Sequence, residues 1–330
     1  MIKNIIGHKS TKKQLEIASA SSNDRNVAIP HILFSGVAGC GKTTMAMELA
    51  HTCNVDFLPV SPDDFTDREA TIRILEKLNH TNYDEFGNRT GNIMPTIVFI
   101  DEIHRMPRKG QEVMGIAMEK LLLETGKTNK YFWIPHFTLV GATTDDGELT
   151  KPFREKFKLR FLFETYSDKE ITDIVAMHAI RKHIIITVKA ARAIAKRSRG
   201  IPRLCVSYLE RARDYQQYLK TSAINERVVE ENFSNMNIDS IGLTRTEVKL
   251  LSLLHDRREP IGLDNMAIVS NESQKNIKNT VEPYLIQKGL IIRGSKGRTI
   301  TEEGIRHLDE NGHLKASRNK VAISPDYVRK

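Results

Sequence analysis

The sequence predicts an α/β domain with a parallel sheet, followed by a small helical domain and a winged helix-turn-helix domain. Three observations support this prediction. Short apolar runs alternate with helical patterns in the first half of the chain, which is typical of a parallel sheet. After about Glu164 the pattern becomes helical. From Leu243 onward, three helical segments precede two short strand-like runs that are joined by glycines and a lysine.

The predicted strands and helices of the first half follow one another in alternation, as a parallel sheet requires. Apolar runs predict strands at His31–Ser35, Val55–Val60, Thr96–Ile100 and Phe137–Gly141. Helical patterns cover Lys42 to about His51, Arg68–Leu78 and about Gln111–Leu122. A hairpin is expected around Gly126–Asn129, and the polar stretch Asn79–Met94 predicts a loop or an insertion.

Capping residues mark helix starts in the second half. Ser167 with Glu170, and Thr244 with Glu247, each have the spacing of a capping box. Pro202 stands where a further helix would begin, which its fixed φ permits. Together the patterns divide the chain into an α/β core at 1–164, a helical domain at 165–240, a winged helix at 241–315 and a loose tail at 316–330.

Composition bounds the class of protein. The chain has 330 residues and a formal net charge of +9, which favours a polyanionic partner without requiring one. Its apolar runs are too short to cross a bilayer, and the first residues lack a secretory hydrophobic segment. Three scattered cysteines without metal-ligand spacing predict reduced thiols, so the expected location is the cytoplasm.

The first motif lies between a predicted strand and a predicted helix. Gly36-Val-Ala-Gly-Cys-Gly41-Lys42-Thr43 fits the pattern G-x-x-x-x-G-K-[ST] at every position. Its glycines let backbone N–H groups turn inward on phosphates, and the helix N-terminus adds a positive end. The motif therefore predicts ATP binding, with Lys42 on the β- and γ-phosphates and Thr43 on Mg²⁺. The residues expected around the nucleotide are Gly36, Gly39, Cys40, Gly41, Lys42, Thr43 and Thr44.

The second motif follows the most apolar strand. Asp101 and Glu102 come directly after Thr96–Ile100, at the strand end where α/β sheets bind ligands. Asp101 is expected to hold Mg²⁺, and Glu102 to orient or deprotonate the attacking water. Thr143 and Thr144 follow the next strand, and one of their hydroxyls is expected to face the γ-phosphate.

Longer stretches resemble one family of AAA+ proteins, the RuvB family of Holliday-junction branch-migration motors. These stretches are Asp101-Glu-Ile-His104-Arg105, Phe137-Thr-Leu-Val-Gly-Ala-Thr-Thr144, Gly200-Ile-Pro-Arg203 and Glu282-Pro-Tyr-Leu-Ile-Gln287. The order of domains is similar too, and the resemblance covers roughly residues 5–308. It implies an AAA+ P-loop core with a parallel sheet, a helical lid, a C-terminal winged helix and a hexameric ring.

The resemblance also implies roles for individual residues. Ile5, Ile6 and Gly7 would line the adenine pocket near Pro202. Thr143 would be the first sensor of the γ-phosphate. Arg203, at the start of a lid helix, would be the second sensor and would couple hydrolysis to lid movement.

The chain departs from the family in three places, as expected of a divergent member. Where the family has its trans-acting arginine finger, this chain has Lys156, with Arg154 two residues earlier. Lysine keeps the charge but lacks the planar fork of arginine, so both residues stay candidates for the finger. The hairpin segment at 124–133 is shorter than the family's, which puts a junction-binding partner like RuvA in doubt. The stretch at 79–94 looks like an insertion.

Basic residues of the C-terminal domain predict contacts with duplex or branched DNA. The helix from Ser273 would bury Ile277 and Val281, which leaves Lys275 and Lys278 for a groove. Pro283 should end or kink that helix. The predicted wing carries three cations suited to phosphates, namely Arg293, Lys296 and Arg298.

Three functions are compatible with these motifs. The first is an ATP-hydrolysing ring motor on branched DNA. The second is an AAA+ switch, such as a replication initiator or a helicase loader, that uses ATP for assembly. The third is a DNA-binding assembly factor with little ATPase activity, against which an intact Glu102 argues.

Overall fold

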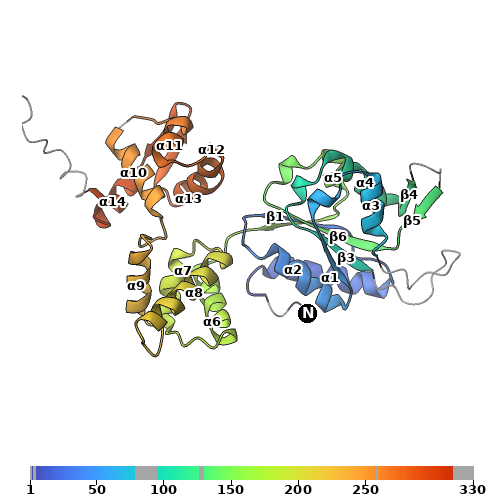
Figure 1. Cartoon of the computed structure of the whole chain (residues 1–330), viewed down its shortest axis with the longest axis horizontal. Coiled ribbons are helices and arrows are strands. Elements are labelled where there is room, and N and C mark those ends of the chain that lie inside the picture. Colours follow the sequence, from blue (N-terminus) through green and yellow to red (C-terminus); the bar gives the residue numbers. More distant parts are fainter. Residues whose placement is uncertain (1, 3–4, 79–94, 126–129, 258, 315–330) are drawn as a thin grey trace, which may run out of the picture. The chain divides into compact units, whose positions relative to one another are not determined.

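The computed structural model describes residues 2, 5–78, 95–125, 130–257 and 259–314. It divides into two compact units (Figure 1). Unit 1 comprises Met1–Ile174 and Gly200–Val206, and unit 2 comprises Val175–Arg199 and Ser207–Lys330. The predicted insertion at 79–94 and the predicted tail at 316–330 lie outside the described residues.

Unit 1 is built on a parallel five-stranded sheet with the strand order β2-β3-β6-β1-β7. The strands are β1 (Ile32–Gly36), β2 (Phe57–Val60), β3 (Thr96–Ile100), β6 (Phe137–Thr143) and β7 (Leu159–Phe163). Every residue of β3 and β6 is buried, which explains their continuous apolar runs. The predicted fold class and the four predicted strands are confirmed.

Helices cover both faces of the sheet (Figure 1). One face carries α1 (Lys9–Asp24) and α2 (Lys42–Cys53), and the other carries α3 (Arg68–Leu75), α4 (Arg108–Lys120) and α5 (Lys151–Glu155). Leu33, Val98 and Leu139 of the sheet join side chains of α3, α4 and α5 in one buried cluster. Short 3₁₀ turns lie at Pro62–Asp64, Ile103–Arg105 and Asp146–Glu148.

A β-hairpin follows α4, as predicted. Its strands β4 (Leu122–Thr125) and β5 (Lys130–Trp133) pair antiparallel, with Leu122 opposite Trp133 and Glu124 opposite Tyr131. Leu123 is buried against the core, whereas Tyr131 and Trp133 are 64% and 70% exposed. The hairpin is therefore anchored on one face and presents aromatic rings on the other.

The lid helices carry the predicted caps. They are α6 (Asp168–Arg181), α7 (Val188–Arg197), α8 (Pro202–Tyr218) and α9 (Glu226–Asn235). The Ser167 N–H and hydroxyl donate to Glu170, and the Glu170 N–H donates back to the Ser167 hydroxyl, which completes the capping box. Pro202 is the first residue of α8.

The winged helix comprises α10 (Arg245–Arg257), α11 (Leu263–Ser270), α12 (Gln274–Asn276), α13 (Glu282–Gln287), β8 (Ile291–Gly294), β9 (Gly297–Ile300) and α14 (Glu302–Glu310). Between α12 and α13 the backbone forms a π-helical segment over Ile277–Val281. Pro283 lacks an N–H and crowds the preceding turn, so the regular α pattern cannot run through it. The regular α-helix is thus interrupted next to Pro283, as the proline predicted.

Most of the lid and the whole winged helix lie in unit 2, where buried polar contacts join them. Arg199, after α7, donates to both carboxylate oxygens of Glu247 in α10, at 2.7 and 2.5 Å. Its guanidinium also lies 4.3 Å from the ring centre of Tyr284. In the connecting segment, Asp239 accepts a 2.7 Å hydrogen bond from His307 of α14. These contacts cross the predicted boundary at residue 240.

Candidate nucleotide site and DNA-binding surface

The phosphate loop runs from the end of β1 into α2. Gly36 has a φ of +127°, and a Cβ there would lie 2.2 Å from the Phe163 carbonyl oxygen. Gly41 has a φ of +91° and precedes the first residue of α2. Only glycine fits both requirements, so the loop can turn its backbone N–H groups toward an anion at the helix N-terminus. Cys40 is buried within the loop, and Thr44 is exposed on the first turn of α2.

Lys42 lies inside this loop. Its ammonium donates to the carbonyl oxygens of Gly36 and Val37, at 2.8 and 3.1 Å, and the residue is only 6% exposed. Burial lowers the pKa of Lys42, whereas the nearby Glu102 and Asp101 carboxylates act to raise it. The loop therefore holds a cation at the place where phosphates would bind.

Asp101 and Glu102, the acidic pair, lie at the carboxyl end of β3, on the same edge of the sheet as the phosphate loop. Thr43 Oγ1 lies 3.5 Å from Asp101 Oδ2. Both are hard oxygen donors, which suits Mg²⁺, since that ion takes one or two protein oxygens and completes its shell with phosphates and water. Among the described residues there is no larger cluster of metal-ligating side chains. Thr43 and Asp101 thus fit the predicted magnesium site.

Glu102 is held by the residue that follows β6. The Thr144 N–H and hydroxyl donate to Glu102 Oε2 at 3.2 and 3.0 Å. Thr143 is fully buried, and its hydroxyl oxygen contacts His104 Nδ1 at 2.9 Å and accepts from the Asp145 N–H at 3.0 Å. Of the two threonines, Thr144 is the one whose hydroxyl contacts Glu102. Thr143 is the one that the resemblance implied as the first sensor of the γ-phosphate.

The segments expected around the adenine meet near the phosphate loop within unit 1. Gly7 packs on Tyr166, whose hydroxyl donates to the Cys40 carbonyl oxygen at 3.2 Å. Ile5 is buried and Ile6 half-buried. The His8 ring packs against the rings of Phe163 and Tyr166, with ring centroids 4.4 and 4.7 Å apart.

The start of α8 contacts the phosphate loop from the other side. The Arg203 N–H donates to the Gly39 carbonyl oxygen at 3.3 Å. A Cβ at Gly39 would lie 2.8 Å from the Arg203 Cβ, so this close approach requires glycine. The Arg203 side chain is exposed, and Pro202 before it is half-buried. Both residues therefore lie next to the loop, where the sequence predicted them.

The two candidates for the finger lie at the end of α5. Lys156 forms an ion pair with Glu119 of α4. The Arg154 guanidinium donates to the Asp146 carbonyl oxygen at 3.4 Å. Both side chains are half-buried, and neither contact is with a residue of the phosphate loop.

Four of the five cations predicted to contact DNA are exposed on the winged helix, namely Lys275, Lys278, Arg293 and Lys296. The exception is Arg298, which is 7% exposed and donates to Glu282 at 2.7 Å. Glu282 is itself buried at 2%, so the pair neutralises two charges inside the domain. Arg298 is therefore not among the candidate DNA-binding residues.

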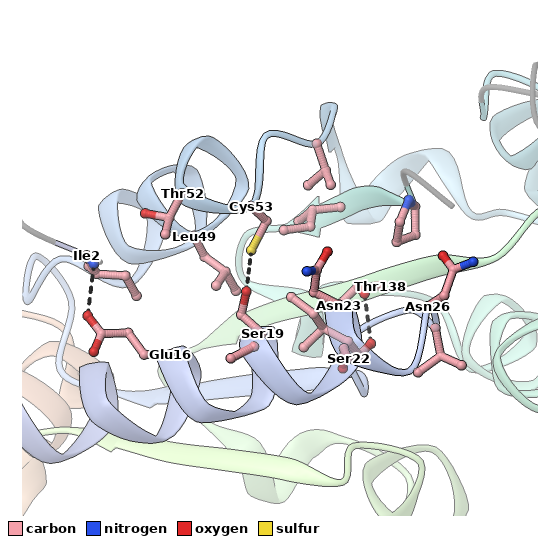
Figure 2. Close-up of a pocket in the computed structure, with 16 residues that line it drawn as sticks. Ile2, Glu16, Ser19, Ser22, Asn23, Asn26, Leu49, Thr52, Cys53 and Thr138 are labelled. Carbon is pink, nitrogen blue, oxygen red and sulfur yellow. Dashed lines mark hydrogen bonds between the residues drawn. The ribbon is translucent and has the colours of Figure 1, made fainter. Parts of the chain in front are cut away.

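A hollow of about 430 Å³ lies elsewhere in unit 1, between α1 and α2 (Figure 2). Its floor includes Ile97 and Thr138, the second residues of β3 and β6, and Ser19 contacts Cys53 on its wall. It therefore opens at the amino ends of these strands. The nucleotide motifs follow their carboxyl ends, so the hollow is not part of the nucleotide site.

The three parts of the chain match three family models in order. Residues 1–162 match the Holliday junction DNA helicase RuvB P-loop domain, residues 166–239 the RuvB AAA lid domain, and residues 240–309 the RuvB C-terminal winged helix domain. Curated relatives from Ehrlichia ruminantium strains Gardel and Welgevonden, each named Holliday junction branch migration complex subunit RuvB, are 32% identical over 94% of this chain and 91% of their own length. The chain belongs to the RuvB family.

Solved RuvB structures agree with this assignment. The Thermotoga maritima RuvB Holliday junction branch migration motor is 31% identical, covers 92% of this chain and 95% of its own, and has a TM-score of 0.77. A mutant of the same protein reaches a TM-score of 0.79 at 30% identity, with 93% and 97% covered. The resemblance seen in the sequence is confirmed, and the chain is an AAA+ ATPase of this family. Membership in the RuvB family favours the prediction of a branch-migration motor over that of a replication initiator or helicase loader.

Three residues of the site were given no role from the sequence. Tyr166 and His8 contact the phosphate loop from distant parts of unit 1, and His104 lies between Glu102 and Thr143. His104 belongs to the Asp-Glu-Ile-His-Arg stretch, so its place in the motif was a usable signal. Tyr166 lies 126 residues from Cys40, and no local pattern marks that contact.

Proposed function

We propose that this chain is an ATP-driven motor that moves Holliday junctions or similar branched DNA by branch migration. The observation that carries this proposal is the meeting of Lys42, Asp101 and Glu102 at one sheet edge, in a RuvB-family chain that also has a basic winged helix. The relatives' names state the same activity, which supports extending it to this protein.

In this proposal the chain's residues divide the work of hydrolysis. Lys42 neutralises the β- and γ-phosphates, and the loop glycines place backbone N–H groups on them. Thr43 and Asp101 hold Mg²⁺, which when bound would neutralise developing charge on the phosphate oxygens. Glu102 orients the attacking water and accepts its proton. Thr144, rather than the buried Thr143, serves as the first sensor because its hydroxyl faces the acidic pair.

Two further elements complete the nucleotide site. Arg203 is proposed as the second sensor, since its backbone contacts the phosphate loop while its side chain is exposed for a ligand. Ile5, Ile6, Gly7 and Pro202 are proposed to surround the adenine. His8 and Tyr166 hold the N-terminal segment against the loop.

A hexameric ring would let a neighbouring protomer supply a cation. We place Lys156 in that role, with Arg154 as the alternative. Lys156→Ala is expected to lower ATPase activity more than Arg154→Ala, with nucleotide binding retained in both. A larger loss in Arg154→Ala would move the role to Arg154.

DNA binding is proposed on the winged helix through Lys275, Lys278, Arg293 and Lys296. Exposed cations on a helix and a glycine-hinged wing suit phosphates, so binding should depend steeply on salt and little on sequence. A RuvA-type partner is proposed to dock on the aromatic face of the β4–β5 hairpin, where Tyr131 and Trp133 are exposed. The cytoplasm is the expected location; no described helix is long and apolar enough to cross a membrane.

The decisive experiment measures ATPase activity with and without four-way junction DNA, beside strand displacement on the same junction. Under the proposal, the junction stimulates hydrolysis and its strands separate only with ATP. Stimulated hydrolysis without strand movement would overturn the motor in favour of an ATP-dependent switch. Glu102→Gln serves as the control that should bind ATP and DNA but move nothing.

A further inference from the structure

One oxygen of the Glu102 carboxylate lies against two hydrogen-bond donors of Thr144 and the imidazole of His104. Glu102 Oε2 accepts from the Thr144 N–H at 3.2 Å and from the Thr144 hydroxyl at 3.0 Å. His104 Nδ1 is the third polar neighbour, at 3.3 Å. The Glu102 backbone adopts a φ of +47°, which is uncommon for a residue with a side chain. Such a conformation persists only where surrounding contacts fix it.

The His104 ring is fixed by the residues around it. Its side chain is 14% exposed. Nδ1 lies 2.9 Å from Thr143 Oγ1, and Nε2 lies 3.8 Å from Glu148 Oε2. Thr143 belongs to fully buried β6, so the ring is anchored to the rigid sheet.

The contacts of Nδ1 identify the tautomer that fits. A lone pair on Nδ1 would face the Glu102 carboxylate at 3.3 Å, which is closer than the 3.8 Å between Nε2 and the Glu148 carboxylate, so a hydrogen on Nδ1 fits better than one on Nε2. With a hydrogen on Nδ1, the ring donates to the Thr143 hydroxyl oxygen at 2.9 Å, and Nδ1 lies 3.3 Å from Glu102 Oε2. That hydroxyl oxygen then accepts from His104 and from the Asp145 N–H, which uses its two lone pairs.

We propose that His104 is a positioning residue for ATP hydrolysis, which fixes Oε2 of Glu102 together with Thr144. The second carboxylate oxygen is then presented to the attacking water in one orientation. This proposal rests on the proposed role of Glu102 as the group that activates water. In this arrangement the His104 imidazole lies between Thr143, at the buried end of β6, and the Glu102 carboxylate.

Fixing the carboxylate matters because proton transfer requires the base within hydrogen-bond reach of the water. A catalytic group displaced by about 1 Å can slow a reaction by about 100-fold. Loss of the His104 contact removes one of the neighbours of Oε2 and leaves the two from Thr144. We therefore expect a drop in kcat of about 10- to 100-fold, with little effect on ATP binding.

The test compares His104→Ala with His104→Asn in the full-length protein. The asparagine amide places an N–H close to the position of Nδ1, whereas alanine offers none. Steady-state ATPase assays with Mg²⁺ and junction DNA give kcat and KM, and a fluorescent ATP analogue gives nucleotide affinity. His104→Ala should lose kcat by the stated factor with KM and affinity within about 3-fold, and His104→Asn should recover most of kcat.

Two reference variants make every outcome informative. Arg105→Ala changes the next residue of the same 3₁₀ turn, which is exposed and pairs with Asp63, and should leave kcat unchanged. Glu102→Gln should abolish hydrolysis. Activity retained in Glu102→Gln would overturn the proposed role of Glu102 itself. If Glu102→Gln is inactive, then full activity in His104→Ala, equal losses in His104→Asn and His104→Ala, or an equal loss in Arg105→Ala would each overturn the role of His104 alone.

Discussion

The His31 ring makes two hydrogen bonds with the backbone that require the ring to be neutral. Its Nδ1 accepts a 2.9 Å hydrogen bond from the Leu139 N–H, and its Nε2 donates to the Met118 carbonyl oxygen at 3.3 Å. A proton added at Nδ1 would point at the Leu139 N–H, so the charged ring cannot keep both bonds. Burial accordingly lowers the pKa of His31 from 6.5 to about 4.

The size of the effect follows from this pKa. The folded protein binds the proton more weakly than the unfolded chain, by about 2.5 pKa units. At 1.36 kcal/mol per unit, that difference is worth about 3 kcal/mol of stability. The contribution is fully present above pH 6.5, is lost progressively as the pH falls, and is gone below about 4. Between pH 7 and pH 5 the loss attributable to His31 is about 2 kcal/mol.

Two measurements check this prediction. An NMR titration of histidine ring signals, assigned with His31→Gln, should show the His31 ring titrating near pH 4. Denaturant unfolding at pH 7 and pH 5 should show the parent losing about 2 kcal/mol more than His31→Gln, whose side chain cannot take up the proton. A ring that titrates near 6.5, or equal losses in the two proteins, would refute the reasoning.

Three other predictions concern backbone strain and buried charge. Gly200 and Gly289 share a φ of +69°, but a Cβ at Gly200 would lie 2.5 Å from a carbonyl oxygen whereas one at Gly289 would meet nothing within 4 Å. Gly200→Ala should therefore lower the free energy of unfolding of unit 1 by about 2 kcal/mol more than Gly289→Ala lowers that of unit 2. Denaturant unfolding measures both values, and similar losses of stability in the two variants would contradict the clash. Arg298→Met should cost about 3–5 kcal/mol of winged-helix stability because it removes the buried partner of Glu282 and leaves only the exposed Arg293, at 3.7 Å. Lys296→Met should leave stability within about 0.5 kcal/mol and weaken DNA binding; the reverse ranking would return Arg298 to the candidate DNA-binding residues. Arg199→Met should cost a similar 3–5 kcal/mol in unit 2, and hydrogen exchange should show the joint between lid and winged helix opening; unchanged protection would contradict its role in that joint.

The elements that form the candidate nucleotide site were predictable because their signals are local. The phosphate loop, the strand before Asp101 and the capping box at Ser167 each occupy a few consecutive residues with a fixed spacing. Such patterns report backbone geometry directly, since glycine, apolar runs and caps have local conformational reasons. Even so, the sequence did not show which of Thr143 and Thr144 contacts Glu102, because side-chain direction at a strand end depends on the register with β3 and on His104.

Other features depend on partners far away in the sequence. The alternation Leu-Arg-Phe-Leu-Phe of β7 gave no strand prediction, and β7 exists because it pairs with β1. The helix α1 was missed as well, since its many serines and alanines weaken the apolar stripe. Arg298 looked like a wing cation until its pairing with buried Glu282, 16 residues earlier, placed it inside the domain.

The segment around Gly200 links the two halves of the proposed function. Arg199 is bound to Glu247 of the winged helix in unit 2, and four residues later Arg203 contacts the phosphate loop in unit 1. Between them, Gly200 holds a φ of +69°, and its carbonyl oxygen accepts a 2.8 Å hydrogen bond from the Tyr166 N–H. Under the proposed role of Arg203 as second sensor, a movement of Arg203 would pull on a chain segment that is bound four residues earlier, through Arg199, to the winged helix. The buried Arg199–Glu247 pair restricts movement between the end of α7 and the winged helix. We therefore expect the lid and the winged helix to move together when nucleotide binds.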